Sequence, residues 1–426
     1  MEQRGKSQFF GRAAAALLLA GLALSGCADG NGGGTTNNNT TTTNNYTTVP
    51  TDPCPTCPVF FNGQNAVSVI GQADFISGNA NRGLAAPTSA TLSGPNGVHV
   101  LSSGLFISDT NNNRILRYET IPLANNASAV GVMGQANLTT GTLAAVSLGG
   151  VSSPNRPGAD TSVAGNNNLY APDIGYRRVA IYSGAATGGG ATATGATVTG
   201  ALGVNSTTGI GGAQCIQSEL VMPGGVSAAG GKLAVVDTGG SRVLLWSTAP
   251  ASNATNTTLP DVVLGQPNFT TCAVGVTASN MQDPGGVWTD GTRLLVADTN
   301  NHRILVWNSW PTTPGQAADL VLGQSSLTAK AIATTQSGLN SPLAVKSNGT
   351  QIFVADSLNR RVMIWNSWPT VNGQPADAVL GQPDFTSSRS ATTWSGMANP
   401  TDVAHWGKYL VVTDSSANRA LVFEGQ

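Results

Sequence analysis

The clearest structural signal in this chain is the stretch Arg293-Leu-Leu-Val-Ala-Asp298-Thr-Asn-Asn-His302-Arg303-Ile-Leu-Val-Trp307. It contains two short runs of β-branched, apolar and aromatic residues, which is the composition of β-strands. The residues between Asp298 and Arg303 are Thr, Asn, Asn and His, which bond to their own backbone or tolerate left-handed geometry. The stretch therefore predicts two successive strands that are joined by a polar turn.

The same spacing of Asp, Arg and an aromatic residue occurs six times along the chain. The Arg follows the Asp by five residues and the aromatic follows the Arg by four, at Asp109/Arg114/Tyr118, Asp173/Arg178/Tyr182, Asp237/Arg242/Trp246, Asp298/Arg303/Trp307, Asp356/Arg361/Trp365 and Asp414/Arg419/Phe423. Successive Asp residues are 64, 64, 61, 58 and 58 residues apart, which indicates a repeat architecture. We expect the Asp to accept amide hydrogen bonds across the turn. The Arg can pair with a carboxylate or with carbonyls of the adjacent unit, while the aromatic fills the layer between units.

Each repeat contains two more strand signals, one before the Asp and one after the aromatic. A first strand begins at a proline fourteen residues before the Asp, at Pro95, Pro223, Pro284, Pro342 and Pro400. A fourth strand ends in Gly-Gln, as in Ala318-Asp-Leu-Val-Leu-Gly-Gln324. The second repeat has no proline at this spacing, and a Gly/Ala/Thr stretch at 184–200 lengthens its last connection. We therefore expect its blade to be the least regular.

The two ends of the repeat region predict how the ring closes. A first Gly-Gln strand, Ala66–Gln72, precedes the first Asp repeat, and the chain stops after a third strand at Leu421–Gln426. The amino-terminal strand should therefore complete the last blade, which removes exposed sheet edges. The prediction is an all-β protein, a six-bladed β-propeller of four-stranded blades over residues 65–426, with an open solenoid as the alternative.

The copies resemble a known repeat family. Val296-Ala-Asp298-Thr-Asn-Asn-His302-Arg303-Ile304, with Pro284-Gly-Gly-Val287 before it, is similar to the NHL repeat, and the other copies match more loosely. The resemblance covers about residues 95–426 and implies a six-bladed β-propeller.

The amino-terminal residues have the pattern of an export signal. Residues 1–26 combine basic residues with a short apolar run, and Leu24-Ser25-Gly26-Cys27 resembles a bacterial lipobox. This resemblance implies cleavage before Cys27 and lipidation of that cysteine, and the following Ala28 favours the outer membrane. Residues 27–64 then form the lipidated cysteine and a Gly/Thr/Asn/Pro-rich tether, which we expect to be disordered.

The remaining cysteines suggest two disulfides. Cys54 and Cys57 form a Cys-x-x-Cys motif whose flanking prolines argue against the helix that a redox-active thiol needs, so a local disulfide is favoured. Cys215 and Cys272 lie in equivalent loops of successive repeats, which is consistent with a disulfide between neighbouring units.

Charge and composition restrict the classes of partner. The chain is 10% charged with a net charge of −1, and it has no basic patch, which excludes nucleic acid. No apolar run after the signal is long enough to span a bilayer, so we expect membrane contact through the lipid anchor alone. The expected partners are a protein, a peptide or a glycan at the cell envelope.

The positions after each leading proline, where propellers place channel ligands, are mostly small and neutral. Oxygen ligands are offered only by Asn96, Asp283, Asn399 and Asp402, which form a candidate channel site for Ca²⁺ or another hard cation. We expect no other cofactor and no catalytic residue. His99 and His405 should point to opposite strand faces and so should not share a metal.

Two further observations bear on function. Trp310 and Trp368 recur in Trp-Asn-Ser-Trp-Pro segments, where they either pack against the fold or form a stacking surface for a peptide or sugar.

Amidating lyases and gluconolactonase-like enzymes share related propellers. The channel His residues of the amidating lyases are not visible here, and neither is the acidic metal site with Glu of the gluconolactonase-like enzymes. The sequence predicts an exported, lipid-anchored, non-catalytic binding or scaffold module. The alternative is a metal-dependent hydrolase or lyase that uses the channel.

Overall fold

The computed structural model describes residues 57–143, 145–147, 149–160, 167–184 and 196–426. The predicted signal peptide, the lipidation site Cys27, Cys54 and most of the predicted tether lie outside these residues. Within the described part of the chain, no helix has the length and apolar character needed to cross a membrane.

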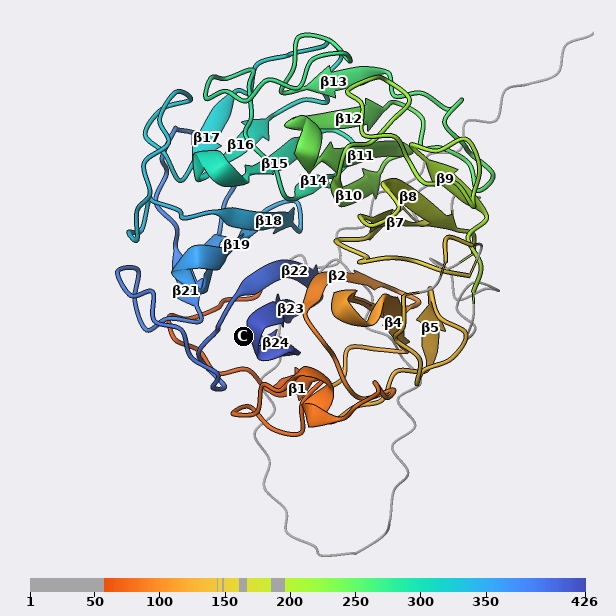
Figure 1. The fold of residues 1–426 in the computed structure, drawn as a ribbon. Helices are drawn as coiled ribbons and strands as arrows, with labels where there is room; N and C mark the ends of the chain where they lie inside the picture. The colour runs from red at the N-terminus through yellow and green to blue at the C-terminus, as the bar shows by residue number, and fades with distance from the viewer. Residues whose placement is uncertain (1–56, 144, 148, 161–166, 185–195) are drawn as a thin grey trace, which may run out of the picture. The chain divides into compact units, whose positions relative to one another are not determined.

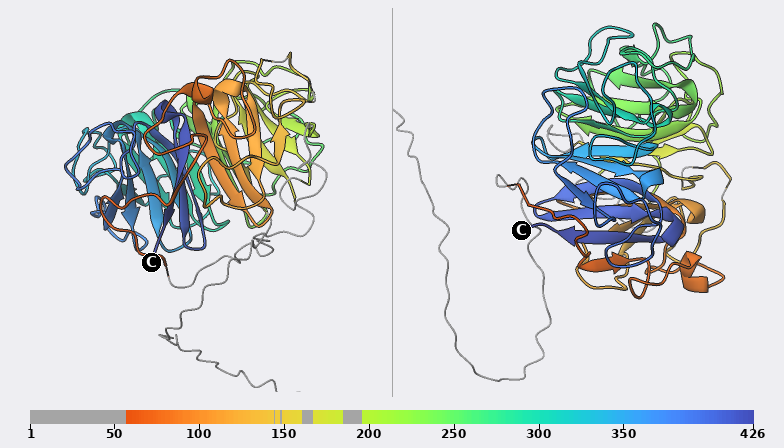
Figure 2. Two further views of the ribbon diagram at one scale, coloured as in Figure 1. Left: turned by 90° about the horizontal axis from the view of Figure 1, so that it is seen from below. Right: turned by 90° about the vertical axis from the view of Figure 1, so that its left-hand side faces the viewer.

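Six four-stranded antiparallel sheets follow one another around a ring (Figure 1), and Figure 2 gives two side views of the same ribbon. Blade 1 consists of β2 (Pro95–Leu101), β3 (Gly104–Asp109), β4 (Arg114–Tyr118) and β5 (Gly131–Met133). Blade 2 consists of β6 (Gly158–Ala159), β7 (Leu169–Asp173), β8 (Arg178–Tyr182) and β9 (Gly200–Leu202). Blade 3 consists of β10 (Pro223–Ala229), β11 (Lys232–Asp237), β12 (Arg242–Trp246) and β13 (Val262–Leu264). Blades 4 and 5 consist of β14 (Val287–Thr289), β15 (Leu294–Asp298), β16 (Arg303–Trp307) and β17 (Leu320–Leu322); and β18 (Pro342–Ser347), β19 (Ile352–Asp356), β20 (Arg361–Trp365) and β21 (Ala378–Leu380). The predicted all-β, six-bladed β-propeller is thereby confirmed.

Blade 6 is built from both ends of the described chain. Its sheet has the order β1 (Ser68–Ile70), β24 (Arg419–Glu424), β23 (Tyr409–Asp414) and β22 (Pro400–Trp406). Strand β1 runs antiparallel to β24, with Ser68 opposite Val422 and Ile70 opposite Ala420. The amino-terminal strand thus completes the last blade, as the sequence predicts, and the ring has no unpaired edge at its closure.

The packed body begins before residue 65, where the sequence analysis places its boundary. Val59 and Gln426 exchange two backbone hydrogen bonds of 2.9 and 3.1 Å. Phe60 is 3% exposed and meets Phe353 of blade 5 edge-on, with ring centroids 6.2 Å apart. Because this ring buries its apolar surface, residues 58–64 belong to the folded body rather than to the tether.

The turn between the second and third strand has the same form in five blades. A single-turn 3-10 helix follows the Asp, in η2 (Thr110–Asn112), η5 (Thr238–Gly240), η6 (Thr299–Asn301), η7 (Ser357–Asn359) and η8 (Ser415–Ala417). The next residue is left-handed, for example His302 at φ 55°. Turn residues that tolerate this geometry are what the sequence places there. A separate 3-10 segment, η1 (Ala80–Gly83), lies in the connection from β1 to blade 1.

Every repeat Arg is fully buried and paired with the Asp of its own repeat. The Nε of each Arg donates to the Asp Oδ2 at 2.7–3.0 Å, in the pairs Asp109–Arg114, Asp173–Arg178, Asp237–Arg242, Asp298–Arg303, Asp356–Arg361 and Asp414–Arg419. The other carboxylate oxygen accepts a backbone amide sixteen residues earlier in five blades, as Asp298 does from Gln282 at 2.7 Å, and twenty-one residues earlier in blade 2, where Ser152 donates to Asp173. Burial raises the pKa of Asp298, while the Arg303 guanidinium opposes that shift.

The remaining guanidinium donors connect one blade to the next. In blade 4, Nη2 of Arg303 donates to the carbonyls of Thr277 and Asn280, both at 2.9 Å, in the loop that leads into the blade. Its Nη1 donates to the carbonyl of Leu327, in the loop that leaves the blade. Arg419 does the same across the closure, where its Nη1 donates to Phe75 at 2.6 Å. The Arg therefore fastens two successive interblade loops to the blade between them.

The residue after the Asp makes a second interblade bond, which the sequence analysis missed. In four blades its hydroxyl donates to the carbonyl of the next blade's leading proline: Thr110 to Pro154, Thr238 to Pro284, Thr299 to Pro342 and Ser357 to Pro400, at 2.5–2.8 Å. The aromatic that ends the third strand packs in the layer toward the preceding blade, as Trp307 and Trp365 do.

Blade 2 departs from this pattern as the sequence predicts, and the structure shows how. Pro154 forms an isolated antiparallel bridge with Asp173, which is the position that Pro95 holds opposite Asp109. Blade 2 therefore has a leading proline, but it lies nineteen rather than fourteen residues before its Asp. The five extra residues fall in the first hairpin, which includes the short strand β6.

Candidate binding site in the central channel

The first strands of the blades surround the centre of the ring, where β2, β10, β14, β18 and β22 can be followed in Figure 1. At the second residue after the leading proline, four blades have only a small residue: Gly97, Gly225, Gly286 and Ala344. A Cβ on Gly97 would lie 2.7 Å from the Cα of Arg156, and one on Gly286 would lie 2.8 Å from the Cα of Ala344. Small residues are required here because adjacent inner strands approach closely.

The two remaining blades carry charged residues at this position, Arg156 in blade 2 and Asp402 in blade 6. Arg156 is 5% exposed. Its Nε donates to the carbonyl of Thr401 at 3.0 Å, and its Nη1 donates to that of Gly285 at 3.4 Å. These acceptors belong to blades 6 and 4, so the side chain reaches across the centre of the ring.

Asp402 is fully buried beside the inner strand of blade 1. Its Oδ2 accepts the Val98 amide at 3.0 Å and its Oδ1 accepts the Val403 amide at 2.9 Å. Among the described residues, Asp402 has no ion-pair partner within 4.0 Å. Its electrostatic attraction to Lys346 and Arg156 therefore acts over a longer distance. Burial raises the pKa of Asp402, and these two cations oppose that shift.

Lys346 on β18 and His99 on β2 complete the charged centre of the channel. The Lys346 Nζ donates to the Val287 carbonyl at 3.4 Å. Burial lowers the pKa of His99 to about 3, with a smaller contribution from Lys346, so the imidazole is neutral at physiological pH. Burial also lowers the pKa values of Arg156 and Lys346, and Asp402 opposes both shifts. The centre of the channel therefore brings two basic side chains, Arg156 and Lys346, near one acidic side chain, Asp402.

A cavity of about 320 Å³ opens at one mouth of the channel. Arg156 lines it together with Asn96, Asn155, Asp283 and Asn300, and the apolar side chains of Ile174, Met222 and Leu343 contribute to its wall. Thr238 and Thr299 also line it, which places the cavity on the face of the Asp–Arg turns. Its size and its mixed lining fit a small-molecule site, at the lower end of the usual range.

The structure brings together two of the four predicted channel residues. Asn96 and Asp283 line the cavity, where Asp283 Oδ2 accepts a hydrogen bond from the Asn300 side chain at 2.7 Å. Asp402 is buried in the centre of the ring and Asn399 binds the Ser415 hydroxyl at 2.9 Å, and neither lines the cavity. The described residues contain no group of three His, Cys, Asp or Glu placed to hold a metal ion. Ca²⁺ binding therefore stays a prediction, and Arg156 and Lys346 would repel a cation beside Asp402.

Arg156 could not be predicted from a proline at a fixed distance before the Asp. The signal was local: Ser153-Pro-Asn-Arg156 has the form of Gly94-Pro-Asn-Gly97 in blade 1. The alignment of these two segments places an arginine at the inner-strand position that Gly97 holds in blade 1.

The two recurring tryptophans lie away from this cavity and mostly pack against the fold. Trp310 is 9% exposed, with the Lys232 Nζ 5.0 Å from its ring centroid. Trp368 donates from Nε1 to the Asn308 side chain at 2.8 Å, and the Arg293 guanidinium carbon lies 4.0 Å from its ring centroid. Cation–π contacts of this kind stabilise a fold as well as a ligand.

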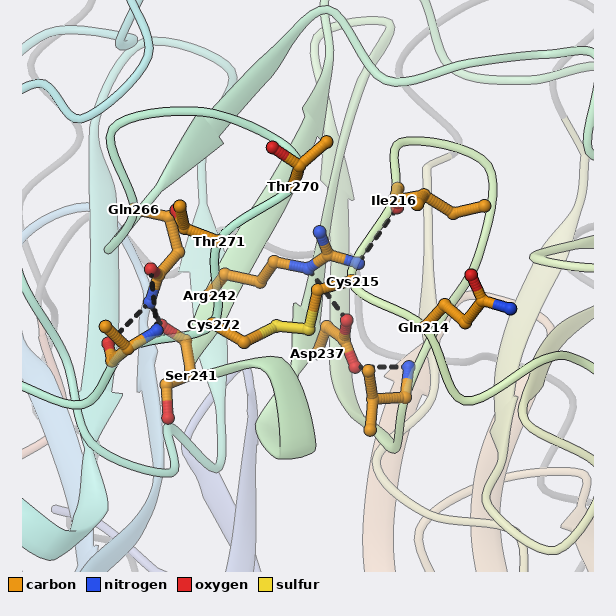
Figure 3. The surroundings of a disulfide bond; sticks show 12 residues. Gln214, Cys215, Ile216, Asp237, Ser241, Arg242, Gln266, Thr270, Thr271 and Cys272 are labelled. Carbon is orange, nitrogen blue, oxygen red and sulfur yellow. Dashed lines mark hydrogen bonds and ion pairs between the residues drawn. A yellow bond between two sulfur atoms is a disulfide. The ribbon is translucent and has the colours of Figure 1, made fainter.

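Cys215 and Cys272 form a disulfide between the loop that leads into blade 3 and the loop that leaves it (Figure 3). Their Cα atoms are 6.1 Å apart. Arg242 joins the same two loops, since its Nη2 donates to the Ile216 carbonyl at 3.1 Å and its Nη1 to the Phe269 carbonyl at 2.7 Å. The disulfide is thus a covalent link in parallel with the repeat Arg, in the blade next to the irregular blade 2.

Comparison with known proteins shows a likeness to solved β-propeller structures. No family model and no curated protein sequence matches the chain significantly, so membership of the NHL-repeat family stays a prediction. The WD40 β-propeller domain of Doa1 is similar in structure, with a TM-score of 0.44 and 11% sequence identity over 85% of this chain and 97% of that one. At this TM-score and identity the likeness carries no argument about function.

Proposed function

We propose that this chain is an exported, lipid-anchored, NHL-like propeller that acts as a non-catalytic binding or scaffold module at the cell envelope. The cavity at the channel mouth carries the proposal, because it gathers amide, hydroxyl and apolar side chains around one arginine. Such a lining provides recognition contacts from several blades at once. The partner, whether a protein, peptide or glycan, would bind the face that carries this cavity.

The position of residue 57 supports this choice of face. The Gln351 side chain donates to the Pro58 carbonyl at 3.0 Å, in the hairpin between β18 and β19. That hairpin and the Asp356 turn lie at opposite ends of β19, since a strand of five residues separates them. The chain thus joins the ring at the face opposite the cavity, so the point of attachment leaves the face with the cavity uncovered.

The Cys215–Cys272 disulfide supports the proposed export. Stable disulfides form in oxidising compartments such as the periplasm and are rare in the reducing cytosol. A predicted signal peptide over residues 1–26, a lipidated Cys27 and a disulfide-bonded body are mutually consistent with an outer-membrane lipoprotein.

The face assignment can be tested by partner capture from envelope extracts. Met222 lines the cavity and is 39% exposed, whereas Val371 is 57% exposed and is not among the cavity's lining residues. Met222→Lys should reduce the yield of co-purified partners at least about tenfold, the expected cost of burying one unpaired charge at an interface. The matched control Val371→Lys should leave the yield unchanged. Equal capture by both variants would move the binding surface elsewhere.

Lipid anchoring is tested separately by Cys27→Ala. The variant should be recovered in the soluble fraction instead of the membrane fraction, because the lipid is the proposed membrane contact. Unchanged membrane retention would refute the anchor without affecting the face assignment.

A further inference from the structure

Two basic side chains, Arg156 and Lys346, share the centre of the channel with a single carboxylate, Asp402. The attraction of Asp402 opposes the lowering of both of their pKa values by burial. His99 does not change this balance, because burial keeps its imidazole neutral at physiological pH. Because an arginine stays protonated in proteins and a buried charge is usually paired, the buried guanidinium of Arg156 favours the approach of an anion.

The cations also have more donors than the protein supplies acceptors for. A guanidinium carries five N–H donors and an ammonium carries three. Among the described residues, Arg156 donates to two carbonyls and Lys346 to one, and two of these three bonds are as long as 3.4 Å. Asp402 is not within 4.0 Å of either cation, and its own oxygens already accept two amides.

Arg156 is the one of these charged groups that lines the cavity at the channel mouth. An anion that enters the cavity would therefore meet its guanidinium, which binds a carboxylate through two parallel N–H bonds. Asp283 lines the same cavity and disfavours a second negative charge on the ligand. Ile174, Met222 and Leu343 offer an apolar wall to the rest of the molecule.

We propose that the channel mouth binds a small organic monoanion, a monocarboxylate with an apolar body, whose carboxylate pairs with the Arg156 guanidinium. Lys346 strengthens the positive potential from below without contacting the ligand. This proposal deepens the proposed function, and it rests on that function only because both use the same cavity. The ligand is either free or a group on the larger partner, and the chemistry at Arg156 is the same in both cases.

The probe is benzoate, measured by isothermal titration calorimetry against benzamide, which has the same ring without the charge. Benzoate should bind saturably with one site per chain, and benzamide should bind at least tenfold more weakly. Added chloride should weaken benzoate binding, because it competes for the same cations. No saturable benzoate binding, or equal binding of benzamide, would overturn the proposal.

Three variants locate the site. Arg156→Gln should reduce benzoate affinity at least tenfold, and Lys346→Gln should reduce it by a smaller factor because only the long-range attraction is lost. Arg293→Gln, which removes a cation that stacks on Trp368 outside the cavity, should leave the affinity unchanged. If Arg156→Gln does not fold, Lys346→Gln decides the matter, since an unchanged affinity in that folded variant would contradict the proposal.

The result of the benzoate test can be distinguished from the result of the partner-capture test of the proposed function. Benzoate binding that depends on Arg156, together with full partner capture by Met222→Lys, would keep the anion site and reject the docking face. Loss of capture by Met222→Lys with no binding of benzoate would do the reverse. In that second case Arg156 would serve as a structural link between blades 2, 4 and 6.

Discussion

Blades 5 and 2 follow the same plan, and they differ where the channel is formed. Blade 5 has Ala344 at the inner-strand position where blade 2 has Arg156. In blade 5 the proline is fourteen residues before Asp356, whereas in blade 2 it is nineteen residues before Asp173. Both blades keep the buried Asp–Arg pair, at 2.7 Å in blade 5 and 2.9 Å in blade 2.

The difference separates the residues that hold the ring from those that give it a ligand site. The repeated Asp, Arg and aromatic residues occupy the turn and the interblade layers in every copy, so they explain the fold. Arg156 departs from the small residues that four other blades have at this position, and it brings a charge into the centre of the ring. Departures from a consistent pattern are expected at functional sites.

The largest effect should come from removing a repeat arginine. Arg361 donates to Asp356, Phe385, Thr335 and Gly338, whereas Arg178 donates to Asp173, Thr207 and Gly150. Arg361→Met should lower the free energy of unfolding by about 3–5 kcal/mol, because it leaves a buried carboxylate unpaired. Arg178→Met should cost less, because fewer acceptors lose their donor. Urea denaturation measures both, and an equal cost would remove this distinction between the blades.

The disulfide beside blade 2 should have the next largest effect. The double variant Cys215→Ala/Cys272→Ala should lower the free energy of unfolding by about 2–4 kcal/mol, because the link closes a long loop in the unfolded chain. Comparison of thermal unfolding with and without reductant gives an independent reading in the unchanged protein. If neither treatment alters stability, the Arg242 bridge between the same loops is sufficient by itself.

The channel centre predicts a pH dependence through His99. Its pKa is about 3 in the folded state, below its ordinary value of 6.5, so the unfolded state binds more protons between these pH values. Stability should therefore fall as the pH is lowered from 6.5 toward 3, by about 2 kcal/mol at pH 5 from this residue. His99→Gln should show a shallower fall in denaturation midpoints over this range. Identical slopes for the two proteins would show that His99 is accessible to protons in the fold.

A smaller effect tests the ring closure. Gln72 Nε2 donates to Asn418 at 2.8 Å and to Asn79 at 3.0 Å, and Gln382 makes the same two bonds to Arg360 at 3.0 Å and Arg389 at 2.8 Å. Gln72→Ala and Gln382→Ala should each cost about 1–2 kcal/mol of unfolding free energy, since each variant loses two partly buried hydrogen bonds. A neutral Gln72→Ala beside a costly Gln382→Ala would indicate that the amino-terminal strand is not held in blade 6.

Much of this fold could be predicted from the sequence because strands and turns carry local signals. The Asp–Arg turns, the leading prolines and the Gly-Gln ends gave the blade number, and the spare strand at Ala66–Gln72 gave the closure. The partners of each Arg could not be predicted, since most are backbone carbonyls and any residue can supply one. Arg156 was hidden because a five-residue insertion shifts its proline, and Asp402 could not be placed beside Lys346 without the ring. Asn96 could be predicted because it follows a leading proline, and Asp283 because it precedes one.

The proposed anion site at Arg156 is tested most directly by diffraction. Crystals of the chain grown in bromide should show an anomalous peak within hydrogen-bonding distance of the Arg156 guanidinium, in the cavity lined by Asn96 and Asp283. The peak should be absent from crystals of Arg156→Gln. Bromide bound only at the outer surface, with the Arg156 donors turned toward Asp402, would contradict the account.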